Sequence, residues 1–128
     1  MTFIELDLEE IYSSERKLNR ERVQKLISLG LEGIIELIKK EPIEFEFVLW
    51  NNKTIMEIIG GIHGCEYAKA LYNLSIKNFS MKLIEKKYLD EIIDYNPIKL
   101  KDVPLLDEHE FMMYQKILSK GDKTISAR

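Results

Sequence analysis

The stretch that decides the fold is residues 43–59, which read IEFEFVLWNNKTIMEII. Apolar and acidic residues alternate from Ile43 to Phe47, and a period of two is typical of a β-strand with one buried face. The strand is predicted to end at Asn51 and Asn52, because adjacent asparagines favour a tight turn. The first half of the stretch is therefore predicted to be a strand.

Residues 54–59 follow the turn and have two interpretations. Thr54 and Glu57 have the spacing of a capping box, which would start a helix. The β-branched residues around them are typical of a strand that returns as the second arm of a hairpin. The local pattern leaves both interpretations open.

The same two periodicities predict the other elements. Alternation predicts strands over residues 2–8 and 79–84, with a short addition at Ile98 and Leu100. Helical spacing of apolar residues predicts helices over residues 19–41, 66–74, 88–93 and 107–121. Strands that alternate with helices predict an α+β fold, with a mixed sheet of about four or five strands and three or four helices packed on it.

The chain is predicted to form one domain over residues 1–121, with a flexible tail over 122–128. In the first helix, Gly30 and Gly33 lie on or beside the apolar stripe. They suit either a close crossing by another element or a break into two helices, and we expect one helix in tight contact with a neighbour.

The last helix is predicted to begin at Asp107, because Glu110 completes a capping box three residues later. Gly121 is expected to end it. Its predicted buried face consists of Phe111, Tyr114, Ile117 and Leu118.

The composition limits the classes of function. The chain has 128 residues and a formal net charge of −3, which makes nucleic-acid binding unfavourable because that requires a positive field that displaces phosphate counterions. Its first residues lack the basic and apolar regions of a signal peptide, and no apolar run approaches the length of a membrane span. The single cysteine excludes an internal disulfide. We therefore expect a cytoplasmic protein with no membrane attachment, and homo-oligomer formation is left open.

The most unusual composition lies at residues 60–66, GGIHGCE, which hold three of the six glycines and the only cysteine. If a helix starts here, its free backbone N–H groups favour an anion such as a phosphate. The candidate ligand-binding residues are Gly60, Gly61, His63 and Gly64. The alternative interpretation is a sharp turn or a tight helix contact without a ligand.

Neither nucleotide-binding motif is complete in this segment. The dinucleotide fingerprint requires glycine at the position of Ile59, and a P-loop requires Gly-Lys-Ser/Thr where residues 64–66 read Gly-Cys-Glu. No cofactor is therefore predicted.

The cysteine suggests two kinds of chemistry, a reactive thiolate and a metal ligand. Cys65 at a helix start, with His63 nearby, would be an activated thiolate, but no oriented base or oxyanion donor accompanies it. We therefore expect a small buried thiol. His63, Cys65, Glu66 and His109 lack the spacing of a zinc site, and no metal is predicted.

One motif suggests an enzyme. Residues 85–87, Glu-Lys-Lys, follow a predicted strand and match the Glu-x-Lys end of the PD-(D/E)xK nuclease pattern, with Glu85 and Lys87 as candidate catalytic residues. The preceding Pro-Asp is missing, and the upstream strand offers only Glu44 and Glu46.

The function expected from the sequence is that of a non-catalytic protein that binds another protein as a regulator or inhibitor. No complete catalytic motif is present in this acidic chain. Two alternatives stay open: a metal-dependent nuclease with a degenerate site, and a sensor that binds an anion or nucleotide at residues 60–66.

Overall fold

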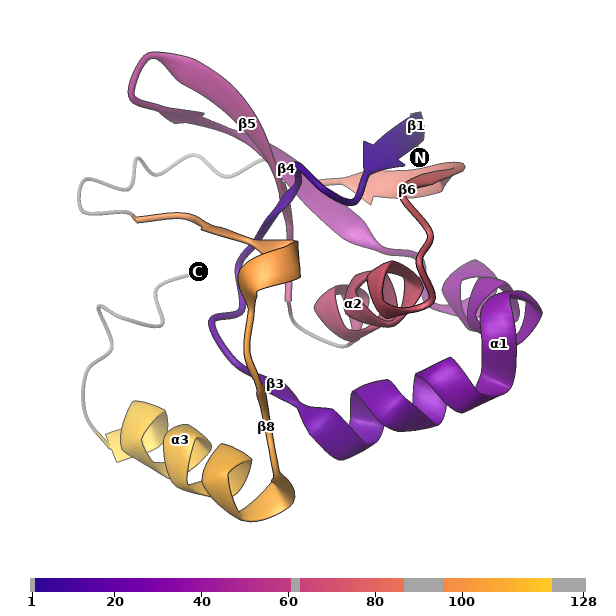
Figure 1. Cartoon of the computed structure of the whole chain (residues 1–128). Helices are drawn as coiled ribbons and strands as arrows, with labels where there is room; N and C mark the ends of the chain where they lie inside the picture. The colour runs from indigo at the N-terminus through magenta and orange to yellow at the C-terminus, as the bar shows by residue number, and fades with distance from the viewer. Residues whose placement is uncertain (1, 61–62, 87–95, 121–128) are drawn as a thin grey trace.

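The computed structural model describes residues 2–60, 63–86 and 96–120 and shows a single α+β domain (Figure 1). In chain order its elements are β1 (Thr2–Asp7), β2 (Tyr12–Ser13), β3 (Leu18–Asn19), α1 (Arg20–Lys40), β4 (Glu44–Trp50), β5 (Lys53–Ile58), α2 (Gly64–Asn73), β6 (Asn78–Glu85), β7 (Ile98–Lys99), the 3-10 helix η1 (Leu100–Asp102), β8 (Leu105–Leu106) and α3 (Glu108–Lys120). The predicted helix over 88–93, the end at Gly121 and the tail over 122–128 lie outside the described residues.

The predicted α+β class is confirmed, and the main sheet is mixed. It has six strands in the order β1-β6-β4-β5-β2-β7, and β3 pairs with β8 in a separate two-stranded sheet. In the main sheet β6 runs parallel to β4 and β2 runs parallel to β5, whereas the other neighbours are antiparallel. The β3–β8 pair is parallel. The predicted mixed sheet is confirmed, and the short strand expected at Ile98 and Leu100 is β7. Among the six strands, β2 was not predicted, because its two residues leave no periodic pattern.

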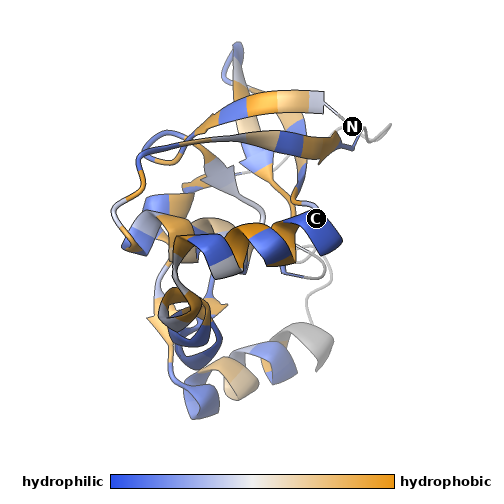
Figure 2. Ribbon diagram, turned by 90° about the vertical axis from the view of Figure 1, so that its right-hand side faces the viewer, coloured by the Kyte–Doolittle hydropathy of each residue, from blue (hydrophilic) through white to orange (hydrophobic). Residues whose placement is uncertain are grey.

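Helices α1 and α2 cover one side of the main sheet. α1 and α2 lie next to each other on that side, and α3 lies apart from the sheet beside β3 and β8 (Figure 1). Apolar and polar residues alternate along the strands and helices (Figure 2). The core therefore lies between the main sheet and the α1–α2 layer, and its largest fully buried side chains include Phe45, Leu6, Ile34, Ile58, Leu71 and Leu83.

The structure decides the ambiguity at residues 54–59 in favour of a hairpin. Asn51 and Asn52 both have positive φ angles, 50° and 59°, the left-handed conformation that a two-residue type I′ turn requires. The turn brings Lys53 opposite Trp50 and continues the register to Ile58 opposite Phe45. The capping-box interpretation is therefore wrong, because cross-strand pairing stabilises the extended backbone.

Helix α1 departs from the prediction at Gly30. Its φ of 75° and ψ of 175° interrupt the helical geometry, so that two helical segments meet at a kink. A Cβ at this position would have no neighbour within 4 Å, and the predicted tight contact is therefore wrong here. At Gly33 an added Cβ would meet Leu29 of the preceding turn rather than another element.

Helix α3 begins as predicted. The Glu110 amide donates to Oδ1 of Asp107 at 2.8 Å, and the Asp107 amide donates back to Oε1 of Glu110 at 3.4 Å, which is the predicted capping box. The predicted buried face is only partly correct, because Phe111 is buried but Ile117 is 66% exposed. The helix contacts the rest of the domain at β3 and β8.

Candidate functional site

Three of the four predicted ligand-binding residues line one cavity of about 340 Å³: Gly60, His63 and Gly64. Gly61 lies outside the described residues. The cavity lies between the first turn of α2 and residues of α1 and α3, and it also receives side chains from the loop that joins β2 to β3. Its volume falls at the lower end of the range for small-molecule sites.

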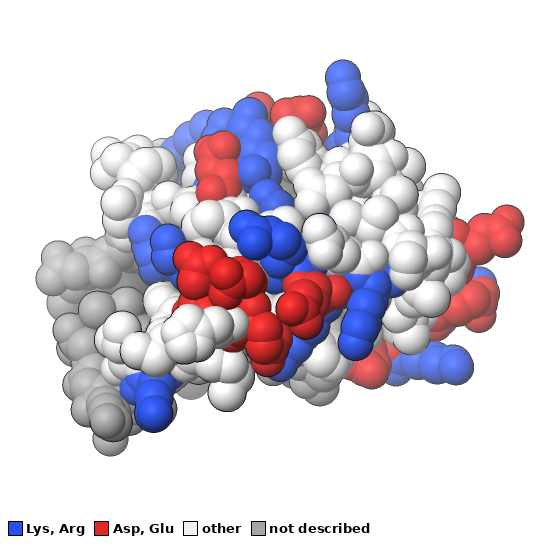
Figure 3. Space-filling view, turned by 60° about the horizontal axis from the view of Figure 1, so that its bottom comes forward, with Lys and Arg blue, Asp and Glu red and all other residues white. Residues whose placement is uncertain are grey.

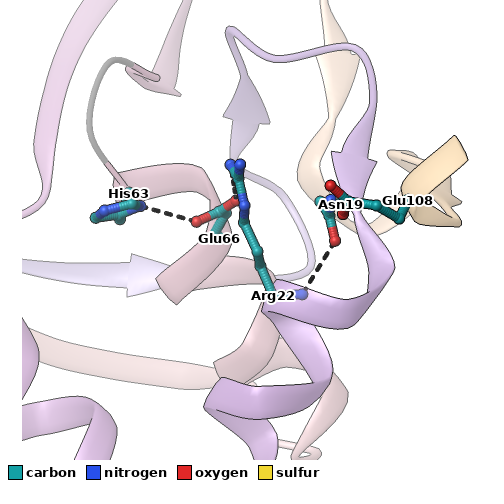
Figure 4. Close-up of polar contacts among 5 residues, drawn as sticks. All are labelled: Asn19, Arg22, His63, Glu66 and Glu108. Carbon is teal, nitrogen blue, oxygen red and sulfur yellow. Dashed lines mark hydrogen bonds and ion pairs between the residues drawn. The ribbon is translucent and has the colours of Figure 1, made fainter. Parts of the chain in front are cut away.

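The Glu66 carboxylate connects two side chains at this cavity (Figure 4). Its Oε1 lies 2.9 Å from Nδ1 of His63, and its Oε2 lies 3.5 Å from Nη1 of Arg22 in α1. The Glu66 side chain is 10% exposed, whereas those of His63 and Arg22 are about half-exposed. A carboxylate this buried needs such partners, because an unpaired buried charge is costly. The pairing thus fixes Glu66 in the first turn of α2.

The start of α1 joins α3 to the same region. Asn19 caps α1, since its Oδ1 accepts a hydrogen bond of 3.1 Å from the Arg22 amide. Its Nδ2 donates to Oε2 of Glu108 in α3 (Figure 4). The Arg22 guanidinium lies 5.5 Å from the centre of the Phe111 ring, a cation–π contact. Three helices therefore meet around the cavity.

Glu15 brings a second carboxylate to the cavity. It lies in the loop between β2 and β3, and its side chain packs so closely against Gly60 that a Cβ there would overlap it. Burial raises the pKa of Glu15 above its ordinary value, and the negative charge of Glu66 raises it further. The absence of a side chain at Gly60 is what makes room for this carboxylate.

The carboxylates of Glu15 and Glu66 make the predicted anion site less favourable. Glu66 lies in the first turn of α2, where it already interacts favourably with the helix dipole, and Glu15 adds a second acidic group nearby. Their charges oppose the binding of a phosphate at the same N–H groups. Anion binding by residues 60–64 stays a prediction, and the cavity chemistry favours a ligand that carries a positive group.

Cys65 is buried, with 1% of its surface exposed. Its Sγ lies 3.4 Å from the Ile58 carbonyl oxygen, to which it donates, and 3.3 Å from Oγ of Ser13, which donates to it. Burial raises the pKa of the thiol to about 11, which outweighs the lowering expected from the helix N-terminus. The prediction of a small buried cysteine is confirmed.

We expect Cys65 to be unreactive in the folded protein. At pH 8 a thiol with a pKa of about 11 is almost entirely protonated, and its sulfur is shielded from reagents. Labelling with a thiol-specific disulfide reagent should be at least roughly a hundredfold slower in buffer than in denaturant. Labelling at the rate of the unfolded chain under native conditions would contradict the buried position.

The nuclease hypothesis requires carboxylates that converge. Glu85 ends β6 opposite Phe45 of β4, so its side chain is on the face of the sheet where Phe45 packs. Glu44 and Glu46 lie on the other face, because side chains alternate along a strand. Lys87 lies outside the described residues. Across residues 2–60, 63–86 and 96–120, no three His, Cys, Asp or Glu side chains are grouped as a metal site would require.

Three charged residues of the cavity were not identified from the sequence: Glu15, Lys17 and Arg22. They lie about forty residues from the glycine segment in the chain and match no motif. The one feature that could have indicated them is the charged stretch at residues 14–22. Such a stretch is also typical of an ordinary surface loop. Chain folding alone brings them to the cavity.

Charges are mixed on the face that Figure 3 shows. Lys and Arg side chains lie beside Asp and Glu side chains there, without a broad basic area. This face therefore lacks the positive field that generic nucleic-acid binding requires. Among the described helices, none is long and apolar enough to cross a membrane.

No protein-family model matches the chain, and no curated protein or solved structure is significantly similar to it.

Proposed function

We propose that this chain is a small, non-catalytic cytoplasmic protein that acts by binding another protein, as a regulator or an inhibitor does. The observation that supports this proposal is an exposed apolar face on the β4–β5 hairpin. Phe47 is 52% exposed and Leu49 is 74% exposed. Met56 lies opposite Phe47 on the same face. We call these three residues the hairpin face.

The hairpin face is exposed because the hairpin extends beyond its neighbours (Figure 1). β6 pairs with β4 only at Glu44 and Phe45, and β2 pairs with β5 only at Glu57 and Ile58. The outer part of the ribbon therefore projects past the described strands. Phe47 contacts the edge of the core, because its ring packs edge-on against the buried Phe45 ring with centroids 5.5 Å apart.

The chemistry of the partner follows from the residues around the hairpin face. Thr54 lies opposite Leu49, so the outward face at these cross-strand positions carries no charge. Each large apolar side chain contributes about 1.5–3 kcal/mol when it is fully removed from water. The hairpin face therefore fits an uncharged, apolar surface of another protein, with apolar burial as the driving force.

The test is recovery of a defined complex. The tagged protein should co-purify from its source cells with one partner in a fixed ratio, and the recombinant pair should associate again in a titration. Phe47→Ser and Leu49→Ser should each weaken that association at least about tenfold, because apolar contact area is lost. The matched control is Phe3→Ser: Phe3 is 68% exposed but lies on β1, where alternation puts it on the opposite face.

Two results would argue against this function. An unchanged affinity of both hairpin variants would remove the hairpin face as the contact. Metal-dependent cleavage of nucleic acid by the purified chain, lost in Glu85→Ala, would favour the nuclease alternative instead.

A further inference from the structure

Two opposite charges line the cavity beside α2 without forming a pair. Glu15 and Lys17 both contribute to its wall. Within the described residues, neither the Glu15 carboxylate nor the Lys17 ammonium group has a hydrogen bond or an ion pair. They also do not pair with each other, although only Arg16 separates them in the chain. Among the described residues, the cavity wall therefore has one carboxylate and one ammonium group without a charged partner, and both are half-buried.

The Arg22, His63 and Glu66 side chains of the cavity already have protein partners. Arg22 and His63 share the Glu66 carboxylate, and the Arg22 guanidinium also lies over the Phe111 ring. These contacts leave Glu15 and Lys17 as the pair of groups available to a bound molecule. Burial of Glu15 raises its pKa, and a positive group of a ligand would lower that pKa again.

The remaining wall and the volume set the size and polarity of the ligand. Leu18, Phe111 and Met112 contribute apolar atoms to a wall that is otherwise mostly polar, and Met112 is the exposed one among them. The volume of about 340 Å³ corresponds to roughly eleven water molecules at about 30 Å³ each, close to the non-hydrogen atoms of one medium-sized amino acid. A nucleotide would be too large to be enclosed.

We propose that this cavity binds a free α-amino acid with an apolar side chain. Its ammonium group pairs with the Glu15 carboxylate, and its carboxylate pairs with the Lys17 ammonium group. Its side chain contacts Phe111 and Met112. The site is separate from the hairpin face, so this proposal does not depend on the proposed function.

Calorimetric titration of the full chain tests the proposal. The probes are L-leucine, L-methionine and L-phenylalanine, each compared with its methyl ester and its N-acetyl derivative. At least one free amino acid should bind, and both derivatives should bind at least about tenfold more weakly, because each loses one charged partner.

Variants locate the binding site. Glu15→Gln and Lys17→Met should each weaken binding at least about tenfold. Glu15→Gln should still fold, because a neutral side chain suits the buried position. The controls Glu32→Gln and Lys53→Met make the same changes at exposed positions outside the cavity and should bind like the parent chain.

Three outcomes would overturn the proposal. One is the absence of binding of all three amino acids at millimolar concentration. Another is equal binding of a methyl ester, which would show that Lys17 does not recognise a carboxylate. The third is unchanged binding in both Glu15→Gln and Lys17→Met.

Discussion

Replacing Glu57 by glutamine is expected to raise the free energy of unfolding at pH 8 by about 3 kcal/mol and to change it little at pH 4. Glu57 has no exposed surface, and burial raises its pKa from 4.5 to about 7. Its cross-strand neighbour Glu46 is also buried, at 4% exposure. Two glutamates thus occupy adjacent interior positions on β4 and β5.

The direction of the pH dependence follows from proton binding. Between pH 4.5 and 7, folded Glu57 holds its proton while the same residue in the unfolded chain has lost it. The folded state then binds more protons, so the stability of the parent chain falls as pH rises through this window and levels off above it. Glutamine has no proton to lose, and this contribution to the pH dependence disappears.

Denaturant unfolding monitored by circular dichroism at pH 4, 6 and 8 measures this effect. Glu5→Gln is the control, because Glu5 is an exposed glutamate on β1. The prediction is wrong if Glu57→Gln gives no more stabilisation at pH 8 than at pH 4.

The second large effect is expected at Gly30, where alanine should lower the free energy of unfolding by about 2–3 kcal/mol. The φ of 75° and ψ of 175° lie in a region that is nearly exclusive to glycine. The cost does not come from crowding, because an added Cβ would have no neighbour within 4 Å. It comes from the backbone conformation that the kink in α1 requires.

A matched substitution separates this strain from helix propensity. Glu32→Ala lies on the same helix at an exposed position and should leave stability nearly unchanged. Denaturant unfolding of the two variants, with helix content from circular dichroism, distinguishes them. If Gly30→Ala is as stable as the parent, α1 can straighten at no cost and the kink is not required by the fold.

The predictable parts of the fold are those that depend on neighbours in the chain. The Asn19 cap, the Asp107–Glu110 capping box and the alternation of β4 each involve residues a few positions apart. Their physical origin is local, since a cap satisfies free N–H groups and alternation is typical of an extended strand. The buried face of β4 does not follow the alternation, because Glu46 is 4% exposed whereas Phe47 is 52% exposed. Local sequence therefore locates these elements correctly.

Residues 54–59 show where local information is insufficient. The same residues suit a helix start and a return strand, and only pairing with β4 and β2 selects the strand. The short strand β2 depends wholly on such pairing, because two residues have no measurable period. The candidate site is also only partly predictable from local sequence. The unusual composition of residues 60–66 indicated Gly60, His63 and Gly64, whereas Glu15 and Lys17 reach the cavity from a distant part of the chain.

By itself, the sequence determined the α+β class, the hairpin's first strand, the helix caps and the unusual glycine segment. The tertiary structure alone decided that Gly60 faces the Glu15 carboxylate and that Glu57 lies in the interior. The physical reason is that burial and charge pairing depend on which distant segments meet. The neighbours of a residue in the chain do not indicate which distant segments it will contact.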